Sequence, residues 1–203
     1  MPRGGYDTPV AQPTTSPLLL ASASPRRRDL LLALGVSFEV HPADVDEAPH
    51  AGESPVATAE RLARAKAHAV AARHPNATIL AADTIVTIDG DTLGKPRDAD
   101  ENAAFLRRLA GRPHTVITAH AMQHAGRLAT ETVTTTVHLR SLSHREIDAW
   151  IARGEGLDKA GGYAIQDMGA ALVGDIHGCY GNVVGLSLPA VVRLAAKLEV
   201  TLV

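Results

Sequence analysis

The sequence has few of the residues on which disulfide-rich and nucleic-acid-binding proteins depend. Its 203 residues include one cysteine, Cys179, which excludes an internal disulfide framework and a cysteine-based zinc cluster and fits a reducing compartment. Aromatic residues make up 3%, too few for a platform that stacks the bases of single strands. A formal net charge of -2 gives no overall positive field to attract DNA or RNA. We therefore expect no nucleic-acid partner.

Long hydrophobic runs are also missing, and none approaches the roughly 20 apolar residues of a membrane-spanning helix. The opening residues 1–16 are rich in proline, glycine and threonine and lack the apolar segment of a signal peptide, so we predict a flexible N-terminal tail. The chain as a whole, with 45% hydrophobic and 21% charged residues, has the composition of a globular protein. We predict a single domain over residues 17–203, no membrane partner and a cytoplasmic location.

Strand and helix patterns alternate along the chain, which predicts an α/β class. Apolar stretches at 17–22 and 36–41 indicate two strands, separated by a helix that begins at Pro25 and stops at Gly35. A longer helix is predicted from Pro55, with an apolar stripe formed by Val56, Ala59, Leu62, Ala63, Ala67 and Val70.

The second half of the chain carries clear turn and cap signals. Hairpins are predicted at Asp89-Gly90 and at Ala125-Gly126, each between apolar or alternating runs. Asp98 and Ser143, each followed three residues later by glutamate, are predicted helix N-caps. His120 and His124 alternate within a strand pattern without the spacing of metal ligands, and we expect them at the surface. A last helix is expected to begin near Pro189.

Positive charge is concentrated where the first helix is expected to begin. Ser24 and Pro25 are followed by Arg26, Arg27 and Arg28. A helix N-terminus already carries about half a positive charge, so arginines are unfavourable there unless an anion is bound. Phosphate suits both the free backbone N–H groups and the guanidinium groups. The alternative is a solvated arginine cluster on the surface.

Asp83 is the strongest candidate among the carboxylates, because it lies inside the most apolar predicted strand. A carboxylate there is costly unless it is paired, binds a metal or reaches a cleft; an aspartate bonded to a nearby turn is the alternative. Lys66 and Lys95 come from a helix face and a proline-bounded loop, and convergence on a polyanion would explain them together with the arginines. Glu47 and Asp83 could hold Mg²⁺ against phosphate oxygens.

Six stretches occur in the order found in the Maf family: LLLASASPRRRDLL, ERLARAKA, AADTIVTIDGDTLGKPRDADE, GRPHTVITA, LDKAGGYAIQD and GCYGNVVGLSL. Over residues 18–198 the chain thus resembles this family of nucleoside triphosphate pyrophosphatases, which is named for an association with septum formation. The resemblance implies an α/β fold like that of inosine triphosphate pyrophosphatases, with a mixed central sheet, helices on both sides and two lobes around a deep cleft. A homodimer is also implied.

The resemblance implies that a nucleoside triphosphate is cleaved between its α and β phosphates, with Mg²⁺ or Mn²⁺ as cofactor. Asp83 falls on the family's proton-accepting aspartate and Glu47 on its acidic partner, and both would hold the metal. The phosphate-binding positions fall on Arg26, Arg27, Lys66 and Lys95, with Ser24 in the serine-rich turn before them.

The branch that this chain resembles acts on dTTP and UTP, and Lys159, Gly161, Tyr163 and Gln166 match its segment. Arg26, Thr84 and Gln166 fall on positions associated with the choice of base. The amide of Gln166 offers a donor and an acceptor to the O4 and N3–H edge of a pyrimidine, although an amide that bonds only backbone groups is the alternative.

Two residues depart from the family pattern: Asp167 stands where glycine is common, and Ser187 where proline is usual. A carboxylate beside Gln166 could repel a triphosphate or alter the choice of base, whereas the second change should affect only the start of the last helix. Two other functions stay open, a nucleotide-binding regulator of septum formation without turnover and a pyrophosphatase for inosine or xanthosine triphosphate.

Overall fold

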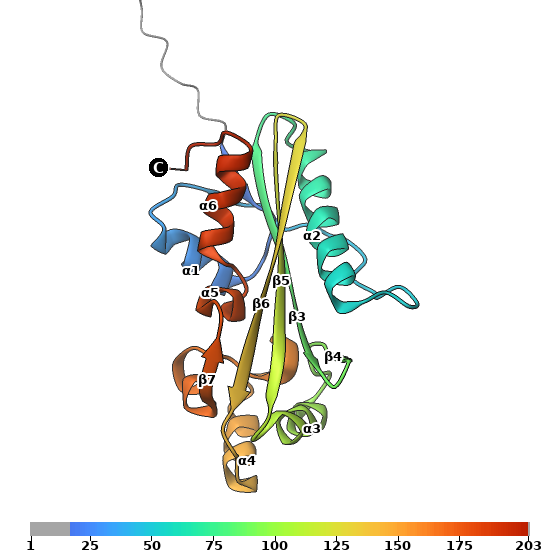
Figure 1. Cartoon of the computed structure of the whole chain (residues 1–203), viewed down its shortest axis with the longest axis vertical. Helices are drawn as coiled ribbons and strands as arrows, with labels where there is room; N and C mark the ends of the chain where they lie inside the picture. The colour runs from blue at the N-terminus through green and yellow to red at the C-terminus, as the bar shows by residue number, and fades with distance from the viewer. Residues whose placement is uncertain (1–16, 203) are drawn as a thin grey trace, which may run out of the picture.

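A long antiparallel pair of strands runs through the centre of the computed structural model, which describes residues 17–202 (Figure 1). The elements, in chain order, are β1 (Leu18–Leu20), α1 (Pro25–Ala33), β2 (Glu39–Val40), α2 (Pro55–Ala71), β3 (Thr78–Ile88), β4 (Asp91–Leu93), α3 (Ala99–Leu109), β5 (Pro113–His124), β6 (Arg127–Leu139), α4 (His144–Arg153), the 3₁₀ turns η1 (Ala160–Gly162) and η2 (Asp167–Leu172), β7 (Val173–His177), α5 (Tyr180–Val184) and α6 (Leu188–Lys197). The predicted flexible tail, residues 1–16, lies outside the described residues.

Within residues 17–202, seven strands form one mixed sheet in the order β2-β1-β3-β5-β6-β7, with β4 paired to β3. β1 runs parallel to β2 and β3, and the other pairs are antiparallel. β5 and β6 pair from Pro113 opposite His138 to His124 opposite Arg127. The predicted turn between them is confirmed, because Ala125 and Gly126 both have positive φ, as a tight two-residue hairpin requires.

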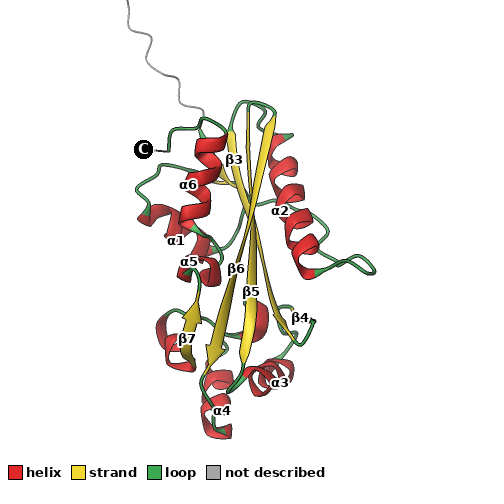
Figure 2. Cartoon of the chain, viewed as in Figure 1, coloured by secondary structure: helices red, strands yellow, loops and turns green. Residues whose placement is uncertain are grey.

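Helices cover both faces of this sheet (Figure 2). On one face, Ile79 and Ala81 of β3 pack in a core with the fully buried alanines of α2. On the other face, Leu80 and Ala82 pack in a second core with residues of α1 and α6. The strand is therefore apolar on both sides, as a central strand must be. The predicted α/β class with a mixed sheet is confirmed; the division into two lobes and the single domain over residues 17–203 stay predictions.

A third core lies at the end of the sheet near α3 and α4 (Figure 1). Trp150 of α4 is buried there and donates its indole N–H to the carbonyl of Gly162 at 2.9 Å. The N–H of Gly161 donates to the carbonyl of Gly94 at 3.0 Å. These bonds fix the segment around η1 against the rest of the domain.

Most of the predicted helices and turns are confirmed, but three local predictions were wrong. Val56 is 41% exposed and does not belong to the buried stripe of α2. Only Glu39 and Val40 of the expected strand 36–41 pair with β1, and both are exposed. His120 is fully buried rather than at the surface. No helix among the described residues is long and apolar enough to cross a membrane.

Candidate active site

A cavity of about 840 Å³ opens between the start of α1, one side of α2, the middle of β3 and the segment before and after η1. All the residues nominated from the sequence line it: Ser24, Arg26, Arg27, Glu47, Lys66, Asp83, Thr84, Lys95, Lys159 and Gln166. They come from segments far apart in the chain, so the fold brings together a cluster that the sequence shows only in pieces. The individual roles assigned to these residues stay predictions.

The start of α1 directs one of its arginines into the protein. Ser24 caps the helix by accepting a hydrogen bond from the backbone N–H of Arg27, and Pro25 occupies the first turn. The guanidinium of Arg27 donates to the carbonyl of Gly185 at 2.8 Å, to Ser22 Oγ at 3.2 Å and to Thr84 Oγ1 at 2.9 Å. These bonds use three of its five N–H groups, so two are left for a ligand.

Burial lowers the pKa of Arg27, and the nearby carboxylate of Asp83 acts in the opposite direction. An arginine retains its charge even so, since its ordinary pKa lies far above neutrality. Arg28, by contrast, bonds to the neighbouring Asp29 and does not line the cavity. The arginine triplet therefore supplies two cations to the cavity and one to the exposed surface.

Thr84 lies beside Arg27 in a short chain of hydroxyl groups. Its Oγ1 is 3.0 Å from Thr118 Oγ1, and Thr118 gives its own hydrogen to the carbonyl of Asn182 at 2.9 Å. Thr84 is therefore the donor to Thr118 and the acceptor from Arg27. This fixes its hydroxyl at the wall of the cavity.

The ammonium of Lys66 joins the two nominated carboxylates. Its Nζ lies 2.7 Å from Asp83 Oδ1 and 2.6 Å from Glu47 Oε1. Burial raises the pKa of Asp83, although the charges of Lys66 and Arg27 oppose this shift. Burial also tends to raise the pKa of Glu47, but the hydrogen bond and charge of Lys66, with Lys95 and Arg27, outweigh it and leave that pKa below its ordinary value.

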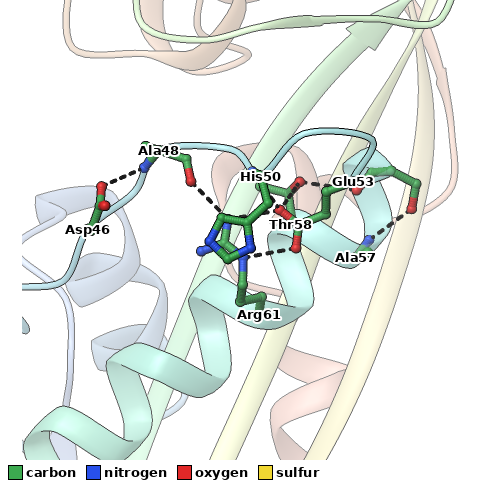
Figure 3. Close-up of polar contacts among 8 residues, drawn as sticks. Asp46, Ala48, His50, Glu53, Ala57, Thr58 and Arg61 are labelled. Atoms are coloured by element: carbon green, nitrogen blue, oxygen red, sulfur yellow. Dashed lines mark hydrogen bonds and ion pairs between the residues drawn. The ribbon is translucent and has the colours of Figure 1, made fainter.

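The loop that carries Glu47 is fixed to the start of α2 (Figure 3). Arg61 donates through Nε and Nη2 to the two carboxylate oxygens of Glu53, each at 2.9 Å, and through Nη2 to the carbonyl of Ala48 at 3.0 Å. Asp46 accepts from the N–H of Ala48 at 2.9 Å. The bonds from Arg61 lower the pKa of Glu53 to about 2. Glu47 thus lies between Asp46 and Ala48, which both take part in this network of hydrogen bonds.

Among the carboxylates that line the cavity, Glu47 and Asp83 are the pair that could hold a divalent cation together, because both contact Lys66. No group of three or more His, Cys, Asp or Glu side chains able to hold a metal occurs within residues 17–202. Mg²⁺, however, is usually bound by one or two carboxylates together with substrate phosphates and water. Two carboxylates that converge on one point, marked here by the ammonium of Lys66, fit that requirement.

Lys159 and Gln166 come from the segment on either side of η1, and both line the cavity. Lys159 Nζ bonds to Asp158 Oδ1 at 2.6 Å and to the carbonyl of Glu155. The segment is anchored by Tyr163, whose hydroxyl lies 2.6 Å from Nε2 of the buried His114. Burial lowers the pKa of His114 to about 4, so this histidine is neutral near pH 7.

Lys95 and Asp167 lie in more open positions. Lys95 is exposed and comes directly after Gly94, whose carbonyl accepts the N–H of Gly161. The loop that carries Lys95 is therefore bonded to the segment around η1. Asp167 is exposed, does not line the cavity and has a φ of 52°. Glycine, the residue common there in the resemblance, adopts such an angle without strain. An effect of Asp167 on the choice of base stays a prediction.

Two polar residues that line the cavity, and a histidine that bonds to a third lining residue, were not nominated from the sequence. Ser22 is buried and accepts from both Arg27 and the N–H of Ser24, and its position two residues before the cap was the available signal. Asp158 pairs with Arg26 at 2.7 Å, and its place directly before Lys159 in the stretch LDKAGGYAIQD was the available signal. The bond of His114 to Tyr163 had no sequence signal, because 49 residues separate them.

Comparison with known proteins gives consistent matches over nearly the whole chain. A family model described as Maf-like protein matches residues 17–198. A dTTP/UTP pyrophosphatase of Myxococcus xanthus is 53% identical over 181 residues, or 89% of this chain and 91% of that protein. Proteins of the same name from Syntrophomonas wolfei, 48% identical over 88% of this chain and 95% of that protein, and Thermomicrobium roseum, 53% over 84% and 79%, are also similar.

Among solved structures, a HAM1 protein from Coxiella burnetii is similar over 91% of this chain and 99% of that chain. The TM-score is 0.48 at 14% identity, a likeness too weak to support an assignment.

Proposed function

Because the chain belongs to the Maf-like protein family, we propose that it is a nucleoside triphosphate pyrophosphatase that hydrolyses dTTP and UTP to the monophosphate and diphosphate. The observation that supports this most directly is the cavity, where a buried aspartate lies among cations from α1, α2 and the segment around η1. A nucleoside triphosphate carries close to four negative charges and suits such a set of cations.

The buried carboxylate of Asp83 is the proton acceptor in this proposal. Water adds to phosphorus, the anhydride between the α and β phosphates breaks, and the proton of the water passes to Asp83. A pKa raised by burial makes Asp83 a stronger base than an exposed aspartate. Arg26, Arg27, Lys66 and Lys95 stabilise the charge that builds up on the phosphate oxygens.

The base of the nucleotide is recognised in this proposal by Gln166, with Arg26 and Thr84 nearby in the same cavity. A primary amide presents a donor and an acceptor side by side, which complements the O4 and N3–H of uracil and thymine. Lys159 comes from the same segment as Gln166, lines the cavity and is a substrate-binding residue in this proposal.

Glu47 and Asp83 hold Mg²⁺ or Mn²⁺ in this proposal, and the bound cation would neutralise phosphate charge. The same proposal includes a cytoplasmic homodimer. Chelation by EDTA should abolish activity, and restoration by Mg²⁺ or Mn²⁺ would identify the metal. Light scattering of the purified chain would give the oligomeric state.

The relatives that match most of the chain are named dTTP/UTP pyrophosphatase, which does not favour the two alternatives, a regulator without turnover and an inosine or xanthosine triphosphate pyrophosphatase. Pyrophosphate release from dTTP, UTP, CTP, 7-methyl-GTP, ITP and XTP tests all three. We expect rapid release from dTTP and UTP, lost in Asp83→Ala and retained in the exposed control Asp29→Ala. Preference for ITP or XTP, or no release from any nucleotide, would contradict the proposal.

A further inference from the structure

One carboxylate pairs with two of the cations at the cavity. Asp158 Oδ2 lies 2.7 Å from Arg26 Nη1, and Asp158 Oδ1 lies 2.6 Å from Lys159 Nζ. Arg26 Nη2 also donates to the backbone carbonyl of Asp158 at 3.4 Å. Arg26 lies at the start of α1, 132 residues before Asp158, so this contact joins two distant parts of the chain at the cavity.

Both cations keep donors that the carboxylate does not use. A guanidinium has five N–H groups, and Arg26 uses two of them on Asp158. An ammonium has three, and Lys159 uses one on Asp158 and one on the carbonyl of Glu155. Asp158 and its neighbour Glu155 therefore hold each cation through only some of its N–H groups. The remaining N–H groups are available to an anionic ligand.

This contact contributes little to the stability of the fold, which argues for a role in ligand binding instead. The side chain of Asp158 is 60% exposed and that of Arg26 is 25% exposed. Ion pairs that water reaches contribute little to folding. Burial acts to raise the pKa of Asp158, but the hydrogen bonds and charges of Lys159 and Arg26 outweigh it, so Asp158 stays ionised at neutral pH.

We propose that Asp158 is a positioning residue for substrate binding, which holds Arg26 and Lys159 with their remaining donors available to the triphosphate. The inference rests on the proposed function and deepens it, because Asp158 acts on the substrate only through these two cations. Long, flexible cations that are already ordered lose less conformational entropy when the ligand binds. Removing the carboxylate therefore weakens binding, even though it adds net positive charge to the cavity.

The experiment compares Asp158→Asn with Asp29→Asn, which removes an equal charge from the exposed partner of Arg28 on α1. For dTTP and UTP we expect Asp158→Asn to raise KM about three- to tenfold and to change kcat by less than about twofold. Asp29→Asn should leave both unchanged, and Asp158→Glu should recover part of the lost affinity. An unchanged or lower KM in Asp158→Asn would overturn the proposal.

A double-mutant cycle tests whether Asp158 acts through Arg26. If it does, Asp158→Asn should raise KM less in the Arg26→Gln variant than in the parent chain. The increase that remains in the double variant would reflect the contact of Asp158 with Lys159. Fully additive effects would overturn the link to Arg26. The melting temperatures of all variants should stay close to that of the parent, because water reaches this ion pair and such pairs contribute little to folding.

Binding of inorganic tripolyphosphate, measured by calorimetry, separates this inference from the proposed function. Absence of turnover with every nucleotide would contradict the proposed function but leave the binding measurement intact. We expect tripolyphosphate to bind Asp158→Asn about three- to tenfold more weakly than the parent. Equal or tighter binding would overturn the positioning role of Asp158 whether or not the chain is an enzyme.

Discussion

Lys66 and Asp83 form an ion pair of 2.7 Å between α2 and β3, with side chains only 10% and 11% exposed. A buried pair of this kind costs much of its attraction in lost hydration, so hydrophobic residues would often serve stability as well. The pair lies at the wall of the cavity, beside Glu47, where the proposed reaction would use both charged groups and a hydrophobic pair could not replace them.

Replacing Lys66 by methionine should leave the carboxylate of Asp83 buried without its main partner. We expect the free energy of unfolding at pH 7 to fall by about 3 kcal/mol. The pKa of Asp83 rises further in this variant, so the folded state takes up a proton and the loss should be smaller at pH 5. Urea unfolding at both pH values measures this. Lys66→Met combined with Asp83→Asn should recover most of the loss, and failure to recover would contradict the explanation.

Asp83→Asn tests the proposed base. We expect kcat for dTTP to fall about 10²- to 10⁴-fold. A side chain that only holds metal should be partly rescued by higher Mg²⁺ or Mn²⁺, whereas loss of a base should not. A metal titration of pyrophosphate release therefore separates the roles, and a kcat within a few-fold of the parent would exclude both.

Arg61→Lys tests the network that holds the loop of Glu47. Lysine keeps the charge but lacks the planar fork that Arg61 uses on Glu53 and the carbonyl of Ala48. We expect the Mg²⁺ concentration for half-maximal activity to rise about three- to tenfold, with little change at saturating metal. Arg64→Lys, on the same helix and bonded to Thr130, is the matched control. An unaltered metal requirement in Arg61→Lys would show that the network does not position Glu47.

His120 should make the fold sensitive to mild acid. Its Nδ1 donates to the carbonyl of Glu131 at 3.1 Å and its Nε2 accepts the N–H of Ser187 at 2.8 Å, so it is neutral. Burial lowers the pKa of His120, like that of His114, from 6.5 to about 4. Below pH 6.5 the unfolded chain binds protons that the folded chain does not, and stability falls until about pH 4.

Each of these two histidines should contribute up to about 3 kcal/mol to that loss. Asp83, whose pKa burial raises, acts in the opposite direction as the pH falls. Urea unfolding between pH 7 and pH 4.5 measures the slope. His120→Gln should have a shallower slope than the parent, and an identical slope would show that His120 does not titrate in this range.

Ser187→Pro introduces the residue that is usual at this position in the Maf family, but it should destabilise this chain. Proline lacks the N–H that Ser187 donates to the buried His120, and it removes the cap that accepts from Ala190. We expect a loss of about 2 kcal/mol in thermal or urea unfolding. Ser187→Ala keeps the N–H and loses only the cap, so it should lose about 1 kcal/mol. Equal losses in the two variants would contradict the role of the N–H.

The parts of the fold that depend on near neighbours could be predicted from the sequence. Ser143 and Glu146 form the predicted capping box, and Asp98 caps α3 as expected. The turn at Asp89-Gly90 has the positive φ values of a tight hairpin. In each case the interacting groups lie within three residues of one another, so local chemistry decides the structure.

The errors arise where partners are distant. His120 was expected at the surface from strand alternation, but β5 is a central strand covered on both faces, where alternation carries no information on exposure. β7 was missed because it is a short, largely exposed strand at the edge of the sheet, inside a glycine-rich segment. Residue types and motif order sufficed to nominate the site, whereas the pairing of Arg26 with Asp158 depends on the fold.

The bond between Arg27 and the carbonyl of Gly185 also affects when the cavity can form during synthesis on the ribosome. These residues are 158 positions apart, and a ribosome that adds roughly 5–20 residues per second needs roughly 8 to 30 s to go from one to the other. Until Gly185 has been added, the guanidinium of Arg27 lacks one of its three hydrogen-bond acceptors. A nascent chain should therefore remain unable to capture nucleotide until its last helices emerge.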